Sequence, residues 1–213
     1  MADEWRSRLP AAKGAQLQPI RPAPTPAAAT DASAAERPLL EYLTSLGLHH
    51  TVYRHPPVMT VEEAQEKGGF QPGLHVKNMF LKAKNKSQKA RRWVVTVPDD
   101  AKVDLKALGK QLGAKGGVSF AKDLQEILGI APGAVTPFAV FNDREAQRVT
   151  SVLSSSIVDG SHELVNAHPL HNEATVGLAP ADLLTFLRSV GHEPVVLDLG
   201  GALPSAPCPL RQV

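Results

Sequence analysis

Apolar residues recur along the middle of the chain with two different periods. Leu39, Leu40, Leu43 and Leu46 stand at helical spacing before Gly47, which predicts a helix over Glu36 to Leu46 that ends at a glycine cap. Residues 75–84 instead alternate between apolar and polar positions, which predicts a strand. The same two patterns predict further strands at 51–54, 93–97, 138–141, 149–153, 163–166, 174–178 and 194–199, and further helices at 61–66, 103–112, 122–128 and 181–190.

The order of these elements predicts an α+β fold. Short turns join several of the predicted strand pairs, so neighbouring strands run in opposite directions at those points. The strands 75–84 and 93–97 form such a hairpin, with a basic turn between them. We therefore expect a mixed, mainly antiparallel sheet that is flanked by helices, rather than a doubly wound parallel sheet.

The two ends of the chain differ from the middle. Residues 1–34 include a run rich in proline and alanine, lack a regular apolar period and cannot bury enough surface to offset chain entropy, so we expect a disordered tail. Residues 200–213 are interrupted by glycine and proline, which predicts a flexible C-terminal tail. One folded domain over residues 35–199 remains, and 213 residues leave little room for a second.

The overall charge does not point to a polyanionic partner. Lys and Arg number 23 against 21 Asp and Glu, a net charge of +2, so a nucleic-acid site requires local clustering. The predicted hairpin turn carries such a cluster, which is either a solvated tip or a contact to RNA phosphates. Its members are Lys82, Lys84, Lys86, Lys89, Arg91 and Arg92.

Several classes of protein are disfavoured. The single Cys208 excludes a disulfide framework and a cysteine zinc site. No apolar run approaches the roughly 20 residues of a membrane-spanning helix, and acidic residues near the N-terminus argue against a signal peptide. We therefore expect a cytoplasmic protein that does not contact a membrane.

Familiar catalytic and metal-binding motifs are missing from the sequence. The eight histidines form no His-Glu-x-x-His pattern, and His168 and His171 are separated by a proline and a leucine, so we expect no metal. Ser154 to Ser156 do not form a Gly-x-Ser-x-Gly elbow. No glycine-rich phosphate loop precedes a Lys-Ser or Lys-Thr pair, so no cofactor is expected either.

Two short segments could nevertheless carry chemistry. On the strand 75–84, Lys77 could bind a phosphate or carboxylate, although adjacent Lys77 and Asn78 face opposite sides of an unbroken strand. The turn from Gly133 to Pro137 could offer backbone N–H groups to an oxyanion. A solvated lysine and a plain connecting loop are the alternatives.

Taken in order, several motifs resemble the prolyl-tRNA editing proteins of the YbaK/ProX group, which are related to the editing insertion of bacterial prolyl-tRNA synthetase. The resemblance extends over about residues 35–199. It rests on His55-Pro56-Pro57-Val58-Met59-Thr60, His75-Val76-Lys77-Asn78-Met79-Phe80-Leu81, Leu128-Gly129-Ile130-Ala131-Pro132-Gly133-Ala134-Val135-Thr136-Pro137 and His168-Pro169-Leu170.

This resemblance implies a barrel-like editing-domain fold and an aminoacyl-tRNA deacylase. The expected substrate is proline tRNA that carries a wrong amino acid, most readily Ala-tRNA(Pro), because a pocket sized for proline cannot strongly reject a smaller side chain. Prolyl-tRNA synthetase is a second expected partner. The alternatives are the same fold acting on Cys-tRNA(Pro) or another small aminoacyl ester, and a tRNA-binding module of a synthetase complex that lacks catalysis.

The resemblance also assigns roles to residues. Lys77 and Asn78 stand at the mouth of the site, and Gly133 begins the loop that holds the carbonyl. The basic turn is richer in lysine and arginine than the resemblance implies, and we expect it to bind tRNA as a feature of this chain. Ester hydrolysis is assisted by the substrate's own ribose hydroxyl and a bound water, so the implied catalytic positions are Lys77, Gly133 and His168. The pocket is shaped by Thr60, Val58, Met59, Ala134, Val135, Thr136 and Pro137.

Overall fold

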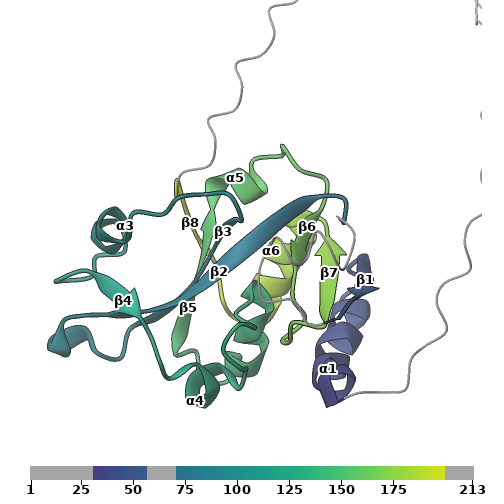
Figure 1. The fold of residues 1–213 in the computed structure, drawn as a ribbon, viewed down its shortest axis with the longest axis horizontal. Coiled ribbons are helices and arrows are strands. Elements are labelled where there is room, and N and C mark those ends of the chain that lie inside the picture. The colour runs from purple at the N-terminus through teal and green to yellow at the C-terminus, as the bar shows by residue number, and fades with distance from the viewer. Residues whose placement is uncertain (1–30, 57–70, 200–213) are drawn as a thin grey trace, which may run out of the picture.

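The computed structural model describes residues 31–56 and 71–199 (Figure 1). The predicted tail up to residue 30, the helix predicted at 61–66 and the predicted C-terminal tail lie outside these ranges. The elements are α1 Asp31–Ser45, β1 His50–Arg54, β2 Leu74–Ala83, the 3-10 helix η2 Lys86–Gln88, β3 Arg92–Pro98, α3 Leu105–Gln111, β4 Val118–Phe120, α4 Leu124–Leu128, the 3-10 helix η3 Pro137–Asp143, β5 Val149–Ser154, α5 Ser155–Val158, β6 Val165–Ala167, β7 Ala174–Leu178, α6 Pro180–Ser189 and β8 Val195–Leu197.

The described strands form one eight-stranded mixed sheet in the order β1-β7-β6-β2-β3-β5-β8, with β4 paired to β2 beside this path. Antiparallel pairs join β1 to β7, β6 to β7, β2 to β3 and β2 to β4, while β2–β6, β3–β5 and β5–β8 are parallel. The mixed sheet and its flanking helices confirm the predicted fold class. No pairing among the described residues joins β1 to β8, so the sheet is open and the barrel-like expectation is corrected.

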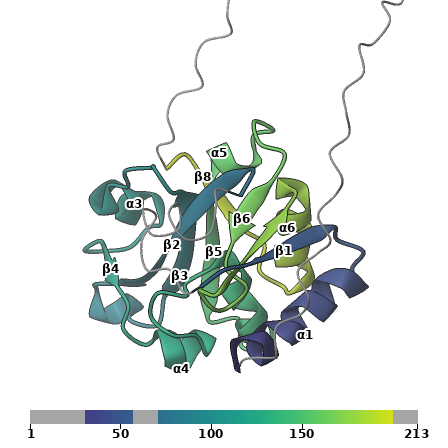
Figure 2. The same cartoon turned by 45° about the vertical axis from the view of Figure 1, so that its right-hand side comes forward.

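Two hydrophobic cores lie on opposite faces of β2 and β3. Phe80 and Val94 belong to a large core that also contains residues of α1, α4, η3 and α6. Leu81 and Trp93, one position along on each strand, belong to a small core with residues of α3. Successive strand residues point to opposite faces, which explains this division. Figures 1 and 2 accordingly show α3 at one end of the molecule and α1 at the other.

One predicted strand is wrong. Residues 138–141 lie in η3, a 3-10 helix that Thr136 caps and Pro137 begins. Pro137 and the following four residues are all buried, without the alternation of a strand on a solvated sheet. A short continuous apolar run does not distinguish a buried helix from a buried strand, and the fixed φ of a proline at the first helical position favours the helix here.

Two further differences concern the limits of elements. Helix α1 begins at Asp31, so residues 31–34 are helical and do not belong to the predicted tail. Strand β4 was not predicted, because its three residues are too few to show a period of two. The predicted hairpin is confirmed, with β2 and β3 paired from Val76 to Lys82 and the short helix η2 within its turn.

Candidate functional site at a split in the sheet

Strand β2 has different neighbours along one of its edges. Leu74 and His75 pair with β6, and Leu81 to Ala83 pair with β4. Between these two pairings, β3 is the only strand among the described residues that pairs with residues 76–80, and Phe80 O also accepts a hydrogen bond from Ala121 N at 2.9 Å. We call residues 76–80 and the gap beside them the sheet split. It contains Lys77 and Asn78, the two strand residues that the sequence singles out.

Lys77 and Asn78 face opposite sides of β2, as the alternation predicts. The register with β3 is continuous, with Lys77 opposite Val97 and Asn78 opposite Thr96, so no bulge turns them together. The exposed Lys77 donates from Nζ to the backbone oxygen of Asp99 at 2.8 Å. Asn78 accepts a hydrogen bond from Thr96 Oγ1 through Oδ1 at 2.7 Å. This bond fixes the amide, whose N–H groups have no acceptor within the described residues and lie on the face of the large core.

The loop from Gly129 to Thr136 lies on the same face as Asn78, since Val135 packs against the large core. Gly133 has a φ of +88°, and a Cβ built there would meet no atom within 4 Å. The amide of Ala134 donates to Ala131 O at 3.1 Å. Within the described part of the chain, the amides of Gly133 and Val135 have no hydrogen-bond acceptor. This loop therefore presents free backbone donors, while the ammonium of Lys77 lies on the other face of the sheet.

The rest of the loop serves the fold. Ala134, Thr136 and Pro137 are buried. The hydroxyl of Thr136 accepts a hydrogen bond from Phe138 N at 3.3 Å and thereby caps η3. Their expected contact with substrate remains a prediction, whereas Gly133 is exposed and Val135 is half-buried.

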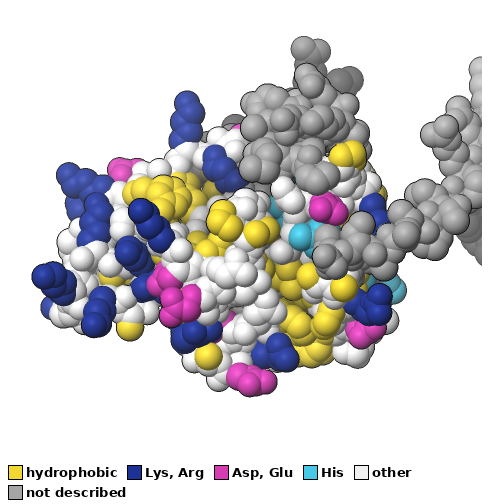
Figure 3. Space-filling view, turned by 60° about the horizontal axis from the view of Figure 1, so that its bottom comes forward, with side chains coloured by type: hydrophobic (Ala, Val, Ile, Leu, Met, Phe, Trp, Pro, Cys, Tyr) yellow, Lys and Arg dark blue, Asp and Glu magenta, His cyan; other side chains and the backbone are white. Residues whose placement is uncertain are grey.

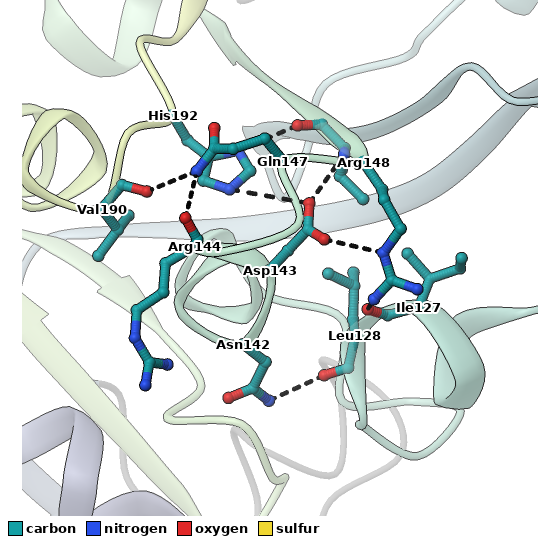
Figure 4. A network of polar contacts seen from close by, with 10 residues as sticks. Ile127, Leu128, Asn142, Asp143, Arg144, Gln147, Arg148, Val190 and His192 are labelled. Atoms are coloured by element: carbon teal, nitrogen blue, oxygen red, sulfur yellow. Dashed lines mark hydrogen bonds and ion pairs between the residues drawn. The ribbon is translucent and has the colours of Figure 1, made fainter.

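A polar network holds both ends of this loop (Figure 4). Asn142, after the loop, donates from Nδ2 to the oxygen of Leu128, before the loop, at 2.8 Å. The fully buried Asp143 accepts hydrogen bonds from Val149 N at 2.8 Å and from Arg148 Nε at 3.1 Å. Arg148 also donates to the backbone oxygen of the residue before Leu128, at 2.6 Å. The network was not predicted, because its partners come from separate elements.

His168 offers a proton acceptor near the sheet split. Its Nδ1 lies 3.0 Å from Ala174 O, and a carbonyl oxygen only accepts, so Nδ1 carries the proton. Burial lowers the pKa of His168, the hydrogen bond to Ala174 partly offsets this, and the neighbouring His55, His171 and His75 lower the pKa further. The imidazole is therefore neutral at pH 7, and its Nε2 has no partner among the described residues.

The other histidines of this region hold the structure together. His55 lies with its ring centre 6.2 Å from that of His168 and contacts Thr175 Oγ1 at 3.0 Å. His171 donates from Nε2 to the buried Glu36 at 2.8 Å, and Arg54 pairs with the same carboxylate. No group of three or more His, Cys, Asp or Glu in the described ranges could hold a metal ion.

A hollow of about 440 Å³ lies elsewhere, along α1. Its lining comes from α1 and the end of β1, and it contains no residue predicted for the site. The lining residues are Glu36, Arg37, Leu40, Glu41, Thr44, Ser45 and Arg54.

The basic residues of the turn fall into two groups: the arginines bind other segments of the protein, and most of the lysines are exposed to solvent. Arg91 donates to the backbone oxygens of Gly113 and Leu112. Arg92 pairs with Asp123 through two nitrogens, and this hydrogen bonding holds the pKa of the Asp123 carboxyl below its ordinary value. These two arginines therefore hold the hairpin against neighbouring segments, and their expected contact with RNA remains a prediction. Lys84, Lys86 and Lys89 are exposed, and Lys82 is half-buried.

Three expected site residues, Thr60, Val58 and Met59, lie outside the described residues. The described segment ends at Pro56 on one side and resumes at Gln71 on the other. Helices within the described ranges are all too short or too polar to cross a membrane.

Comparisons of the sequence with a family profile and with known proteins point to the same family. The sequence profile of the aminoacyl-tRNA editing domain matches residues 55–186. Prolyl-tRNA synthetase associated domain-containing protein 1 of Bos taurus is 41% identical over 163 residues, which cover 75% of this chain and 92% of that protein. Prolyl-tRNA editing protein ProX of Acetoanaerobium sticklandii is 34% identical over 168 residues, 78% of this chain and 98% of that protein.

A solved structure shares the fold. It is described as a candidate trans-editing enzyme for prolyl tRNA synthetase and superposes with a TM-score of 0.56 at 20% identity. The match covers 82% of this chain and 99% of that chain.

Proposed function

Because the chain belongs to the aminoacyl-tRNA editing domain family, we propose that it hydrolyses the ester of mischarged proline tRNA, most readily Ala-tRNA(Pro). The observation that carries the proposal is the pair of amide donors at Gly133 and Val135, which have no acceptor among the described residues and lie on the same face of the sheet as Asn78. Backbone donors fixed in advance stabilise the oxyanion of an acyl-transfer reaction without a covalent nucleophile.

In the proposed reaction, a water oxygen attacks the carbonyl carbon of the aminoacyl ester. Negative charge develops on the carbonyl oxygen, where the amides of Gly133 and Val135 donate to it. The water proton passes to the neighbouring ribose hydroxyl or to Nε2 of the neutral His168, and a proton returns to the departing ribose oxygen. The bond from the carbonyl carbon to the ribose oxygen then breaks, and the amino acid and tRNA leave.

Lys77 has a different role in this proposal. Its Nζ uses one hydrogen for Asp99 O, which leaves two ammonium hydrogens for a phosphate of the RNA. Since the side chain lies on the face opposite Gly133, it acts as a fixed charge at the mouth of the sheet split and does not touch the reacting carbonyl. Asn78, by contrast, can donate its amide hydrogens to the aminoacyl group.

The substrate preference follows from size. A site that admits alanine but not proline supplies the discrimination that the synthetase pocket lacks, because each missing methylene changes binding by only about 1–3 kcal/mol. Cys-tRNA(Pro) is the nearest competing substrate. The cysteine side chain is intermediate in size between those of alanine and proline, so the relative rates at which alanine and cysteine are released decide between the two substrates.

A panel of Ala-, Cys- and Pro-tRNA(Pro) tests the proposal with wild type and Lys77→Ala. We expect the fastest release from Ala-tRNA(Pro) and a higher KM for Lys77→Ala with a similar kcat. Faster release of cysteine would overturn the preference for alanine. Intact tRNA binding without release of any amino acid would overturn the enzymatic proposal and favour a non-catalytic tRNA-binding module.

A further inference from the structure

Basic residues are concentrated in one part of the chain. Residues 82–122 contain 11 of the 23 Lys and Arg and three of the 21 Asp and Glu, so the rest of the chain has an acidic excess. In the space-filling view these side chains gather at the end of the molecule that holds α3 and β4 (Figure 3). We call six exposed lysines from the hairpin turn, α3 and the loop before β4 the basic end; they are Lys84, Lys86, Lys89, Lys106, Lys110 and Lys115.

The basic end is one rigid surface although it comes from three segments. Gln88 in the hairpin turn accepts a hydrogen bond from Lys115 N at 2.7 Å and donates to Gly113 O at 3.2 Å. Arg91 binds the same oxygen. None of the six lysines forms an ion pair within the described residues. Their charges are therefore available to a polyanion.

An exposed aromatic side chain lies between this surface and the sheet split. Phe120 is 60% exposed, and the other large hydrophobic residues found exposed in the described part of the chain are Val195 and Val196 of β8. Phe120 pairs with Leu81 at the end of β4 that borders the sheet split. Directly paired residues share a face, so Phe120 lies on the face that carries Lys77. Leu81 lies four residues along the strand from Lys77, which corresponds to about 13 Å.

From this arrangement we propose that Phe120 stacks on an unpaired base of the RNA, while the basic end contacts phosphates of the adjoining duplex. The inference rests on the proposed function, because the ester sits on the 3′-terminal ribose and must reach the sheet split. A single strand that enters the split from the basic end passes Phe120 and then Lys77. Aromatic side chains beside basic grooves bind unpaired bases in this way.

An acidic protein segment would also satisfy the lysines. It would not require an exposed phenylalanine beside the mouth of the split, whereas a base offers a flat face that matches the ring. The six unpaired lysines are spread over a turn, a helix and a loop, an arrangement that suits the phosphates of a duplex.

Equilibrium binding to a tRNA(Pro) transcript tests the inference without depending on catalysis. The variants are Phe120→Ala, Phe120→Trp and, as a matched control, Val196→Ala at the other exposed hydrophobic site. We expect Phe120→Ala to weaken binding about tenfold. Phe120→Trp retains affinity and gains a tryptophan emission that the RNA quenches. Val196→Ala binds as wild type does.

The same transcript without its unpaired 3′-terminal nucleotides locates the contact. Wild type should bind this shortened RNA at least as weakly as Phe120→Ala binds the full transcript, because the contact to Lys77 is lost with the base, and Phe120→Ala should bind the shortened RNA as wild type does. Joint replacement of Lys106, Lys110 and Lys115 by Gln should flatten the salt dependence of binding.

Equal affinity of Phe120→Ala and Val196→Ala for the full transcript would overturn the inference, even if wild type releases alanine. Complete displacement of the transcript by polyglutamate at a similar charge concentration would also overturn it, in favour of an acidic protein partner. Loss of alanine release in wild type, with these binding results intact, would instead overturn the proposed function alone.

Discussion

The network around Asp143 and the candidate site both contain polar groups, but these groups differ in whether they form hydrogen bonds within the described part of the protein. Around Asp143, the carboxylate, Arg148, Asn142 and Gln147 all bind partners within the protein (Figure 4). In the candidate site, by contrast, the amides of Gly133 and Val135 and Nε2 of His168 have no such partner among the described residues.

This difference predicts which residues contribute to stability and which contribute to function. Polar groups that bind one another around the buried Asp143 stabilise the fold and fix the position of the loop between α4 and η3. Donors and acceptors that are held in place without a partner can instead bind a substrate, because they do not have to give up an internal hydrogen bond first. Substitutions in the network should therefore change the free energy of unfolding, and substitutions at the split should change kinetics.

The largest effect is expected from Asp143→Ala. Removal of the buried carboxylate leaves Val149 N without its acceptor and should lower the free energy of unfolding by about 3 kcal/mol. Urea denaturation measures this loss. Glu193→Ala is the control, because its ion pair with Arg188 is exposed and should contribute less than about 1 kcal/mol. Equal losses for the two variants would show that the network does not stabilise the fold.

Two glycines in nearly the same backbone conformation allow the effect of backbone strain to be distinguished from a catalytic role. Gly133 and Gly160 have φ values of +88° and +89°, and a Cβ at either meets no atom within 4 Å. Each Ala variant should lose about 1 kcal/mol of stability through backbone strain. Only Gly133→Ala should lower kcat for ester hydrolysis, by about a hundredfold, because it moves the amide donors. Full activity of Gly133→Ala would contradict the role of this loop.

A smaller kinetic effect is expected from Asn78→Asp. The carboxylate can still accept the hydrogen bond from Thr96, but it lacks the N–H groups of the amide. We expect a kcat/KM about tenfold lower at nearly unchanged stability, measured with Ala-tRNA(Pro). Thr96→Ser preserves the hydroxyl and should behave as wild type. If Asn78→Asp retained wild-type kcat/KM, the amide would have no contact with the substrate.

The smallest expected effect is that of His168 on the pH dependence of stability. Its pKa is lowered in the folded protein, so between the folded and unfolded pKa values the unfolded chain binds more protons. The contribution of His168 to stability is therefore present above about pH 6.5, the ordinary value for histidine, and is lost as the pH falls. Unfolding measured from pH 7 to 5 should be less pH-dependent in His168→Gln. An identical pH profile would contradict this assignment.

Much of the fold could be predicted because its signals are local. The alternation along β2 gives both the strand and the opposite orientations of Lys77 and Asn78. The run that begins at Pro137 was misassigned, since five consecutive buried residues have no period that separates a strand from a helix.

The candidate site was only partly predictable, because it depends on contacts between distant segments. Asn142 binds Leu128 across the loop, and Gln147 binds Val190 across 43 residues. Nothing local distinguishes Arg91 and Arg92, which bind other segments, from the free lysines of the same turn. The phenyl ring of Phe120 could have been noticed as an isolated aromatic residue, but its place beside the split required the pairing of β4 with β2.

Single-turnover release of alanine from Ala-tRNA(Pro), with Pro-tRNA(Pro) as the comparison, tests the central claim most directly. The account predicts that excess wild-type protein releases alanine well above the spontaneous rate while proline stays attached. Spontaneous rates for both esters, in a preparation that binds the tRNA, would contradict it.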